Sequence, residues 1–316
     1  MTTPLDAVRG ALYGHLCGDA LGVPYEFLEP DDVPAEIAWS GGGAHRQPAG
    51  TFSDDGALML AAAASLLARE GFDADDFGRR CVRWLDEGEL ACGGTAFDAG
   101  GTTRGAIDRL RAGCPAEQAG PTDPARAGNG ALMRIVPIAL WTSRDPVETQ
   151  IWIAMRASSV THGAPASRVA CAAYALLVRA LLRDESPQHA LTGAWSTLEA
   201  APDVAHNPGL RAALAELRAY QQRTGSGFVF DCFWSAFDAF AAAEDYVDAV
   251  RRAIRYGRDT DTTACVAGGL AGLGFGVAGI PREWRDGLRL TPAQRILIED
   301  FADHAAQRLD THRNSA

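Results

Sequence analysis

The chain has 316 residues, of which 47% are hydrophobic, and it carries a formal net charge of −11. This length fits one large domain or two ordinary ones, and the apolar share is enough for a full core. The negative charge disfavours broad binding to nucleic acids or anionic membranes, because both would repel the surface. An acidic site can still bind a phosphorylated ligand when metal cations offset its carboxylates.

Helical periodicity recurs along most of the chain. Apolar residues stand three or four apart within 5–16, 58–66, 77–85, 169–181, 247–254 and 297–301. This spacing is typical of helices that bury one face, and the abundance of Ala favours helices too. We expect 227–234 (GFVFDCFW) to be the one extended segment, and 41–50, rich in Gly and Pro, to be a loop.

Pairs of a capping side chain and a proline mark further helix starts. They are Asp123-Pro124, Asp145-Pro146, Ser186-Pro187, Asn207-Pro208 and Thr291-Pro292. The cap oxygen accepts hydrogen bonds from free N–H groups, and proline suits the first helical position because it has no N–H to lose. Glu148 and Gln294 stand where a capping box would need them.

These patterns predict one all-α domain over 1–316, with a core of about 5–310 and a frayed tail at 312–316. The seven cysteines are odd in number and include no CxxC pair, which indicates buried thiols in a reducing compartment. The first residues form no basic-then-apolar leader, and no apolar run is long enough to span a bilayer. We therefore expect a cytoplasmic protein.

Two acidic clusters stand out, each directly before a helix. The first contains Ser53, Asp54 and Asp55, and the second contains Asp259, Asp261 and Thr262. Carboxylates two residues apart can curl around one ion, whereas adjacent ones point apart and can serve two ions, or one ion and a water. All-oxygen ligands favour Mg²⁺ or Mn²⁺ over Zn²⁺. The alternative is that these aspartates cap helices, and periodicity does not show whether the clusters meet.

Six motifs occur in a specific order. They are GALYGHLCGDALGVPYEF (10–27), TFSDDGALM (51–59), FDAGGTTRGAIDRL (97–110), GNGALMRIVPIAL (128–140), SSVTHGAPAS (158–167) and GRDTDTTACVAGGLAG (257–272). Together they resemble the ADP-ribosylglycohydrolase family, which includes the dinitrogenase-reductase-activating glycohydrolases. The resemblance implies a single compact all-α bundle with a binuclear metal site. Two divalent cations, Mg²⁺ or Mn²⁺, would lie between the two clusters, so the resemblance implies that the clusters meet.

The resemblance also implies a substrate site. Glu26 matches a glutamate near the substrate linkage, although by itself it is a surface carboxylate at a helix end. The loop with Asp98, Gly100, Gly101 and Thr102 would lie along the ADP-ribose, and Gly128, Asn129 and Gly130 would hold ribose and phosphate. Arg134 is either a ligand contact or a structural partner, and His162 either lines the site or packs. Gly56 departs from the usual Thr, which is expected to loosen the helix start or alter the surroundings of one metal ion.

The resulting hypothesis is a hydrolase that cleaves the ribose C1″ bond of an ADP-ribosyl adduct. Glu26, Asp54 and Asp55 would be catalytic. The partner would be an ADP-ribosylated protein or a small ADP-ribosyl compound, with arginine the first choice of acceptor, and a monomer is expected rather than an oligomer. Serine-linked and nucleic-acid-linked ADP-ribose remain open. Rival hypotheses are an ADP-ribose-binding protein, a toxin-immunity protein and a phosphohydrolase.

Overall fold

The computed structural model of the chain describes residues 3–311, so the predicted frayed tail lies outside the described residues. The described part is built from helices, with isolated β-bridges at Gly42–Gln47 and Gly128–Phe228. The prediction of an all-α fold is therefore confirmed. The α-helices are α1 (Pro4–Gly22), α2 (Asp54–Arg69), α3 (Ala74–Glu87), α4 (Gly101–Arg111), α5 (Val136–Trp141), α6 (Val147–Ser159), α7 (Pro165–Leu181), α8 (Pro187–Ala200), α9 (Pro202–Ala205), α10 (Pro208–Ala219), α11 (Val229–Ala241), α12 (Tyr246–Ile254), α13 (Thr260–Phe275), α14 (Arg282–Gly287) and α15 (Pro292–Thr311). The 3₁₀ turns are η1 (Val23–Tyr25), η2 (Pro30–Asp32), η3 (Cys92–Gly94), η4 (Ala116–Gln118), η5 (Pro124–Arg126), η6 (Leu132–Arg134) and η7 (Val277–Gly279).

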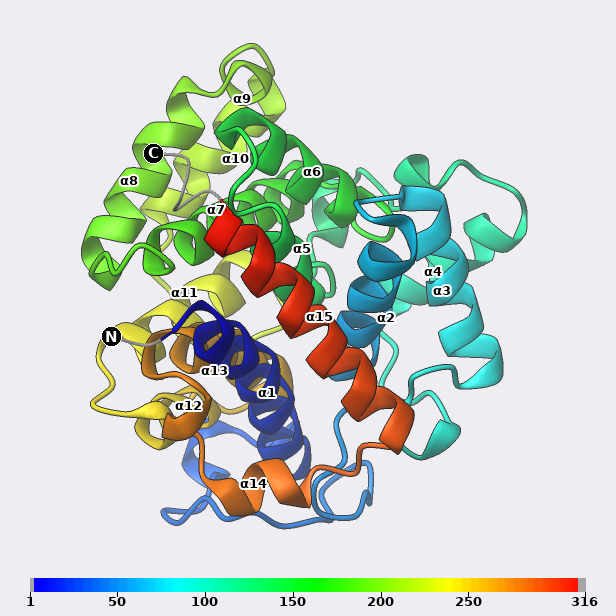
Figure 1. Cartoon of the computed structure of the whole chain (residues 1–316). Coiled ribbons are helices and arrows are strands. Elements are labelled where there is room, and N and C mark those ends of the chain that lie inside the picture. Colours follow the sequence, from blue (N-terminus) through cyan, green and yellow to red (C-terminus); the bar gives the residue numbers. More distant parts are fainter. Residues whose placement is uncertain (1–2, 312–316) are drawn as a thin grey trace.

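The centre of the fold is an antiparallel pair of helices, α1 and α13, from opposite ends of the chain (Figure 1). From Gly10 to Gly22 every fourth residue of α1 is glycine, so the two backbones touch. The facing pairs are Gly10–Gly272, Gly14–Gly268, Gly18–Ala264 and Gly22–Asp261. A methyl group on any of the four α1 glycines would lie 2.1–2.4 Å from a backbone atom of α13. This stripe of small residues fixes the register of the two helices, so that the end of α1 lies beside the start of α13.

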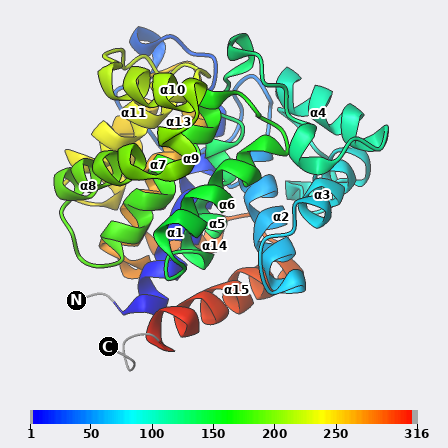
Figure 2. The same cartoon turned by 90° about the horizontal axis from the view of Figure 1, so that it is seen from above.

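The other helices surround this pair. Helices α2, α3 and α4 lie on one side and α8, α10 and α11 on the opposite side, as both views show (Figures 1 and 2). Helix α15 packs against both α1 and α2. The Arg9 guanidinium contacts Glu299 at 2.6 Å, and the Tyr13 hydroxyl donates to the same carboxylate at 2.9 Å. These contacts tie the last helix to the first.

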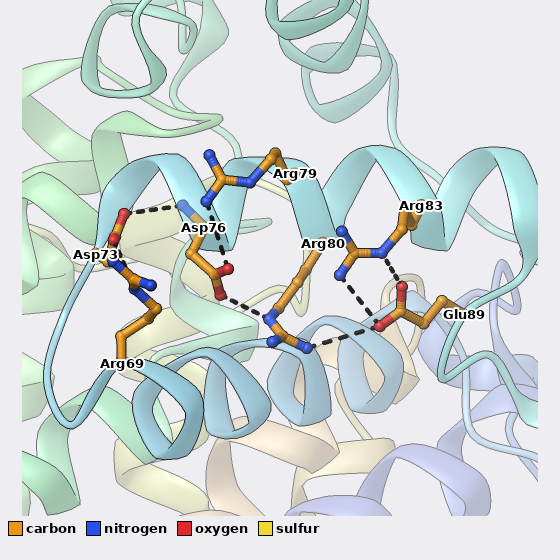
Figure 3. A network of polar contacts seen from close by, with 7 residues as sticks. All are labelled: Arg69, Asp73, Asp76, Arg79, Arg80, Arg83 and Glu89. Carbon is orange, nitrogen blue, oxygen red and sulfur yellow. Dashed lines mark hydrogen bonds and ion pairs between the residues drawn. The ribbon is translucent and has the colours of Figure 1, made fainter.

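A polar network stabilises the turn from α2 to α3 (Figure 3). Asp73 caps α3 by accepting a hydrogen bond from the backbone N–H of Asp76 at 2.9 Å, and its other oxygen accepts from Arg69 of α2. Arg80 contacts both Asp76 and Glu89, at 2.8 and 3.6 Å. Ion pairs near the surface contribute little singly, whereas the cap contributes about 1 kcal/mol. The network lies at the end of α2 far from its first residues.

The segment 227–234 corrects one prediction. Only its first residues are extended, and α11 begins at Val229. The sequence of this stretch predicts an extended segment, but Phe230, Phe233 and Phe237 are buried at helical spacing. Burial of this face overrides the local β preference of the aromatic side chains.

The predicted helix starts have mixed outcomes. Ser186 and Asn207 cap α8 and α10, and Thr291 forms a capping box with Gln294. Asp123 caps only the 3₁₀ turn η5. Asp145 caps nothing, because its carboxylate pairs with Arg308 of α15, so the capping box with Glu148 was wrong.

The described cysteines are all free thiols, and all are buried except Cys114, which is half-buried. Burial raises the pKa of Cys81 to about 11, so this thiol is protonated at neutral pH. Within residues 3–311, no helix is both long and apolar enough to cross a membrane.

Candidate active site

The fold contains a pocket of about 390 Å³ where the segment after α1 and the start of α2 meet the start of α13. It is lined by Glu26, Phe27, Asp54, Asp98, Ala99, Gly100, Gly101, Thr102, Thr103, Gly128, Asn129, Gly130, Met133, His162, Gly227, Asp259 and Thr262. Most of the residues singled out in the sequence are in this lining. Ser53, Asp55 and Asp261 lie beneath it, and Arg134 lies outside it.

The two acidic clusters meet at the floor of this pocket. Ser53 caps α2, with its hydroxyl accepting from the Asp55 N–H at 3.3 Å. Asp54 faces the pocket, whereas the Asp55 carboxylate turns inward and accepts a hydrogen bond from the Thr262 hydroxyl at 3.2 Å. This contact joins residues 207 positions apart in the sequence. The N-termini of α2 and α13 thus converge, and their dipoles favour negative charge there.

The carboxylate oxygens form two groups that share Asp261. One oxygen each from Asp19, Asp55 and Asp261 lie within 4.8 Å of one another, and so do one each from Glu26, Asp259 and Asp261. The Oδ2 atoms of Asp55 and Asp261 are buried without a hydrogen-bond partner among the described residues. Buried carboxylate oxygens are normally satisfied, so unpaired ones in a shared cluster fit a site for hard cations.

Burial and mutual repulsion raise the pKa values of the whole cluster. Burial raises the pKa of Asp19 to about 7 and that of Glu26 to about 10. For Glu26 the charges of Asp98 and Asp259 add to the effect of burial. The pKa values of Asp55 and Asp261 are also raised, first by burial and then by neighbouring carboxylates. Without cations the site therefore favours protonated carboxyl groups.

Asp19 is a site residue that the sequence reasoning did not identify. It lies in α1, fully buried, and its carboxylate accepts from the backbone N–H groups of Ser53 at 2.9 Å and Gly56 at 2.8 Å. It therefore caps the start of α2 from another helix. The available signal was a lone carboxylate within an apolar helix, GHLCGDALG, with no Lys or Arg one turn away.

The same contact explains Gly56. A methyl group there would lie 2.7 Å from Leu16 Cδ2, 2.8 Å from Phe52 Cδ2 and 3.0 Å from Asp19 Oδ2. The start of α2 is thus packed tightly against α1, and the expectation of a loosened helix start is wrong. Glycine is the residue for which there is room at this position.

One side of the pocket is built around Glu26. His45, from the 41–50 loop, places Nε2 2.5 Å from Glu26 Oε2 and 3.6 Å from Asp98 Oδ1. The His45 ring packs between Phe27 and Phe97, with ring centres 5.6 and 5.3 Å away. Phe27 is 63% exposed at the pocket edge. His45 was not identified from the sequence, because the residues around it in a Gly-rich loop do not indicate which part of the fold the loop will contact.

Left-handed backbone conformations surround the same region. Phe27, Asp98 and Arg258 have φ values of 68°, 59° and 59°. Phe27 and Arg258 are held by backbone hydrogen bonds, from Phe27 N to Arg258 O and from Arg258 N to Leu28 O, both 2.6 Å. Such conformations are strained for non-glycine residues and persist where surrounding contacts impose them, often at functional sites.

The loop 128–130 forms the opposite wall. The Asn129 backbone N–H donates to Gly227 O at 3.0 Å, and its side chain donates to Asp259 Oδ2 at 2.9 Å. The segment around Gly227 is fixed by buried Asp231, which accepts hydrogen bonds from the backbone and hydroxyl groups of Thr224 and Ser226. Burial would raise the pKa of Asp231, but these hydrogen bonds outweigh it and lower the pKa.

Arg134 lies behind this wall, whereas His162 is part of it. The Arg134 guanidinium is buried and donates to Gly130 O, Ala157 O and the Thr161 hydroxyl, so it supports the loop from outside the pocket. The His162 ring lines the pocket and packs under Gly128 and Gly130. Burial, followed by the charge of Arg134, lowers the pKa of His162 to about 3, so this imidazole is neutral.

Comparisons with known proteins agree with this architecture. The family model described as ADP-ribosylglycohydrolase matches residues 1–315. The chain is 32% identical to ADP-ribosylarginine hydrolase Tri1 of Pseudomonas putida (strain GB-1), over 96% of this chain and 80% of that protein. It is 27% identical to ADP-ribosyl-[dinitrogen reductase] glycohydrolase of Rhodospirillum rubrum, over 92% of this chain and 93% of that protein.

A solved structure is also similar. It is described as an ADP-ribosylglycohydrolase-related protein complex, and the match has a TM-score of 0.79 at 32% identity, covering 96% of this chain and 100% of that one. The family model and these relatives, together with the all-α fold, identify the chain as an enzyme of the hydrolase class. The chain belongs to the ADP-ribosylglycohydrolase family.

Proposed function

We propose that the protein is a metal-dependent hydrolase that releases ADP-ribose from a modified acceptor by cleaving the N-glycosidic bond at ribose C1″. The observation that carries this proposal is the meeting of both acidic clusters beneath one pocket, with Asp261 shared between two groups of carboxylate oxygens. Membership of the family supports the reaction class. The carboxylate cluster supports the proposed use of metal ions in that reaction.

Two divalent cations, Mg²⁺ or Mn²⁺, would be held by Ser53, Asp54, Asp55, Asp259, Asp261 and Thr262. The donor set supports this assignment, because it consists of carboxylate and hydroxyl oxygens and includes the unpaired Oδ2 atoms of Asp55 and Asp261. When bound, the cations would supply positive charge that offsets the carboxylates and holds substrate oxygens.

The side chains of the protein would carry the proton and charge movements. Glu26, whose pKa is raised first by burial, would hold a proton and deliver it to the leaving nitrogen of the acceptor. Asp54 and Asp55 would orient the attacking water and accept its proton. Cleavage at C1″ develops positive charge on the sugar ring, which the surrounding carboxylates would stabilise. His45, bonded to Glu26, would restrict the position of the acid.

The two loops would bind the ADP-ribosyl group. Asp98, Gly100, Gly101 and Thr102 would lie along the ligand, and Gly128, Asn129 and Gly130 would hold ribose and phosphate. Glycines on both walls support this assignment, because small residues allow backbone N–H groups to approach phosphate oxygens. His162 would contact the ligand directly, whereas Arg134 would act through the loop that it supports.

We favour arginine as the acceptor, on an ADP-ribosylated protein or a small ADP-ribosyl compound. The relative from Pseudomonas putida carries arginine in its name, as does a second relative from Serratia proteamaculans (strain 568) at 31% identity, over 92% of this chain and 77% of that protein. The edge of the pocket also suits a planar cation, because it combines the Asp98 carboxylate with the exposed ring of Phe27.

The test is a cleavage panel over arginine-, serine- and nucleotide-linked ADP-ribose, with Mg²⁺, Mn²⁺ or EDTA present. Release of ADP-ribose from the arginine substrate is expected with either cation and not in EDTA. Asp54→Ala should abolish release while the chain stays folded, and Asp73→Ala, which removes a surface carboxylate at α3, should retain it. Full activity of Asp54→Ala, or full activity in EDTA, would overturn the metal-dependent mechanism.

A further inference from the structure

A buried chain of hydrogen bonds runs from Arg134 to the pocket. Arg134 Nη1 donates to Gly130 O at 2.8 Å and to Thr161 Oγ1 at 2.6 Å, and Nη2 donates to Ala157 O at 3.2 Å. The guanidinium also lies over the Phe77 ring, 5.0 Å from its centre. A guanidinium has no acceptor, so the direction of the contact with Thr161 is fixed: the Thr161 hydroxyl oxygen accepts.

Because the Thr161 hydroxyl oxygen accepts from Arg134, its hydrogen is free to be donated to another group. Thr161 Oγ1 lies 2.8 Å from His162 Nδ1, and both residues are buried. If Nδ1 carried the proton, Oγ1 would accept twice, and its own hydrogen would be left without an acceptor among the described residues. A buried hydroxyl hydrogen without a partner is unfavourable. The hydroxyl therefore donates to Nδ1, and the proton of the neutral imidazole is on Nε2.

The Nε2 atom is on the ligand side of the ring. A methyl group on Gly128 would lie 3.4 Å from His162 Nε2, and one on Gly130 would lie 3.2 Å from it. His162 lines the pocket together with both glycines, and no hydrogen bond from Nε2 occurs within residues 3–311. The absence of side chains on the loop leaves this N–H open to a ligand.

We propose that Arg134 and Thr161 are positioning residues that hold His162 as the Nε2–H tautomer, so that this wall of the pocket presents a fixed, neutral hydrogen-bond donor to an oxygen of the bound ADP-ribosyl group. The opposite tautomer would turn a lone pair toward that oxygen and repel it. The ligand part of this proposal rests on the proposed function, whereas the tautomer is a property of the ligand-free protein.

The first experiment is ¹⁵N NMR of ligand-free protein labelled at histidine. His162→Ala identifies the His162 signals by their loss. In the wild type, Nε2 should resonate in the protonated range and Nδ1 in the unprotonated range. The reverse pattern, or averaged signals from two tautomers, overturns the proposal even if the enzyme cleaves its substrate. If the protein shows the expected Nε2-protonated signals but releases no ADP-ribose from any substrate, the proposed function is wrong and the tautomer assignment still holds.

The second experiment measures kinetics of Thr161→Val, with Thr161→Ser as its matched control. Valine removes the hydroxyl at similar size, so KM should rise roughly ten-fold, as expected for one lost hydrogen bond to a charged oxygen. Serine keeps the hydroxyl and should restore the wild-type KM and the wild-type NMR pattern. In a His162→Ala background, Thr161→Val should have no further effect on KM. An equal loss in that background, or no rescue by serine, would overturn the proposal.

Discussion

Replacing Asp261 with asparagine is expected to have opposite effects on stability and on cation binding. Asp261 contributes an oxygen to both groups of carboxylates, and its Oδ2 is buried without a partner among the described residues. Its Oδ1 accepts the Thr262 N–H at 2.9 Å, a bond that asparagine can keep. The new amide would face the oxygens of Asp19 and Asp55, so a repulsive contact would become a hydrogen-bonding one.

The magnitude follows from the same contacts. The unpaired Asp261 carboxyl group is costly to bury, either because it repels its neighbours when ionised or because it must take up a proton, so its replacement by an amide should stabilise the cation-free protein by about 1–3 kcal/mol. Unfolding entropy near the midpoint is about 2.1 cal/mol/K per residue, so 316 residues give about 0.66 kcal/mol/K, and a gain of 2 kcal/mol raises Tm by about 3 °C. In the wild type, each cation at about 100 times its Kd should add about 2.7 kcal/mol, or about 4 °C.

The assay is differential scanning calorimetry in EDTA and then in Mg²⁺ or Mn²⁺. Asp261→Asn should melt higher than the wild type in EDTA and should lose most of the rise in Tm that cation produces. Asp231→Asn is the matched control, because Asp231 is equally buried but satisfied by hydrogen bonds from Thr224, Ser226 and Ser235. It should melt lower than the wild type in EDTA and keep the rise in Tm with cation.

Two results would refute this reasoning. If Asp261→Asn melts lower than the wild type in EDTA, the carboxylate cluster is not under electrostatic strain. If its Tm rises with cation as much as that of the wild type, Asp261 does not bind the ions. Either result would remove the main support for a two-cation site, whatever the activity of the variant.

Further predictions follow from other parts of the structure. Burial raises the pKa of Asp19 from 3.8 to about 7, so the folded state binds this proton more tightly than the unfolded state does. The resulting contribution to stability is complete below about pH 4 and is lost as the pH rises through 7. Calorimetry in EDTA should therefore show Tm falling between about pH 4 and 7, and saturating Mg²⁺ should flatten that slope; a Tm in EDTA that rises over this range would contradict the assignment. Gly56→Thr should destabilise the protein by about 1–3 kcal/mol in urea unfolding, because its side chain overlaps Leu16 and Phe52; wild-type stability would show that α1 and α2 are less tightly packed than described. Asn207→Ala should cost about 1 kcal/mol in the same assay, since Asn207 accepts from Gly209 and Leu210 at the start of α10, and unchanged stability would indicate that this cap is dispensable.

Local chemistry was enough for much of the fold. Helical spacing of apolar residues identified α1, α2, α3, α7, α12 and α15, and cap-and-proline pairs located the starts of α8, α10 and α15. Sequence patterns alone predicted the wrong structure around Phe230, in a stretch that looks extended but forms a helix. They also failed at Asp145, whose carboxylate pairs with a residue of α15 instead of capping a helix. In both places a contact made only in the folded protein decides the outcome.

The sequence by itself determined which residues could carry the chemistry: Asp54 and Asp55 near one end, Asp259 and Asp261 near the other, and the glycine loops between them. Only the tertiary structure decided that these residues share a site, because the glycine stripe of α1 lets its backbone touch α13 and aligns their ends. It also decided the roles of Asp19, His45 and Thr161. Their partners are distant in sequence or depend on the direction of a buried hydrogen bond, and local pattern encodes neither.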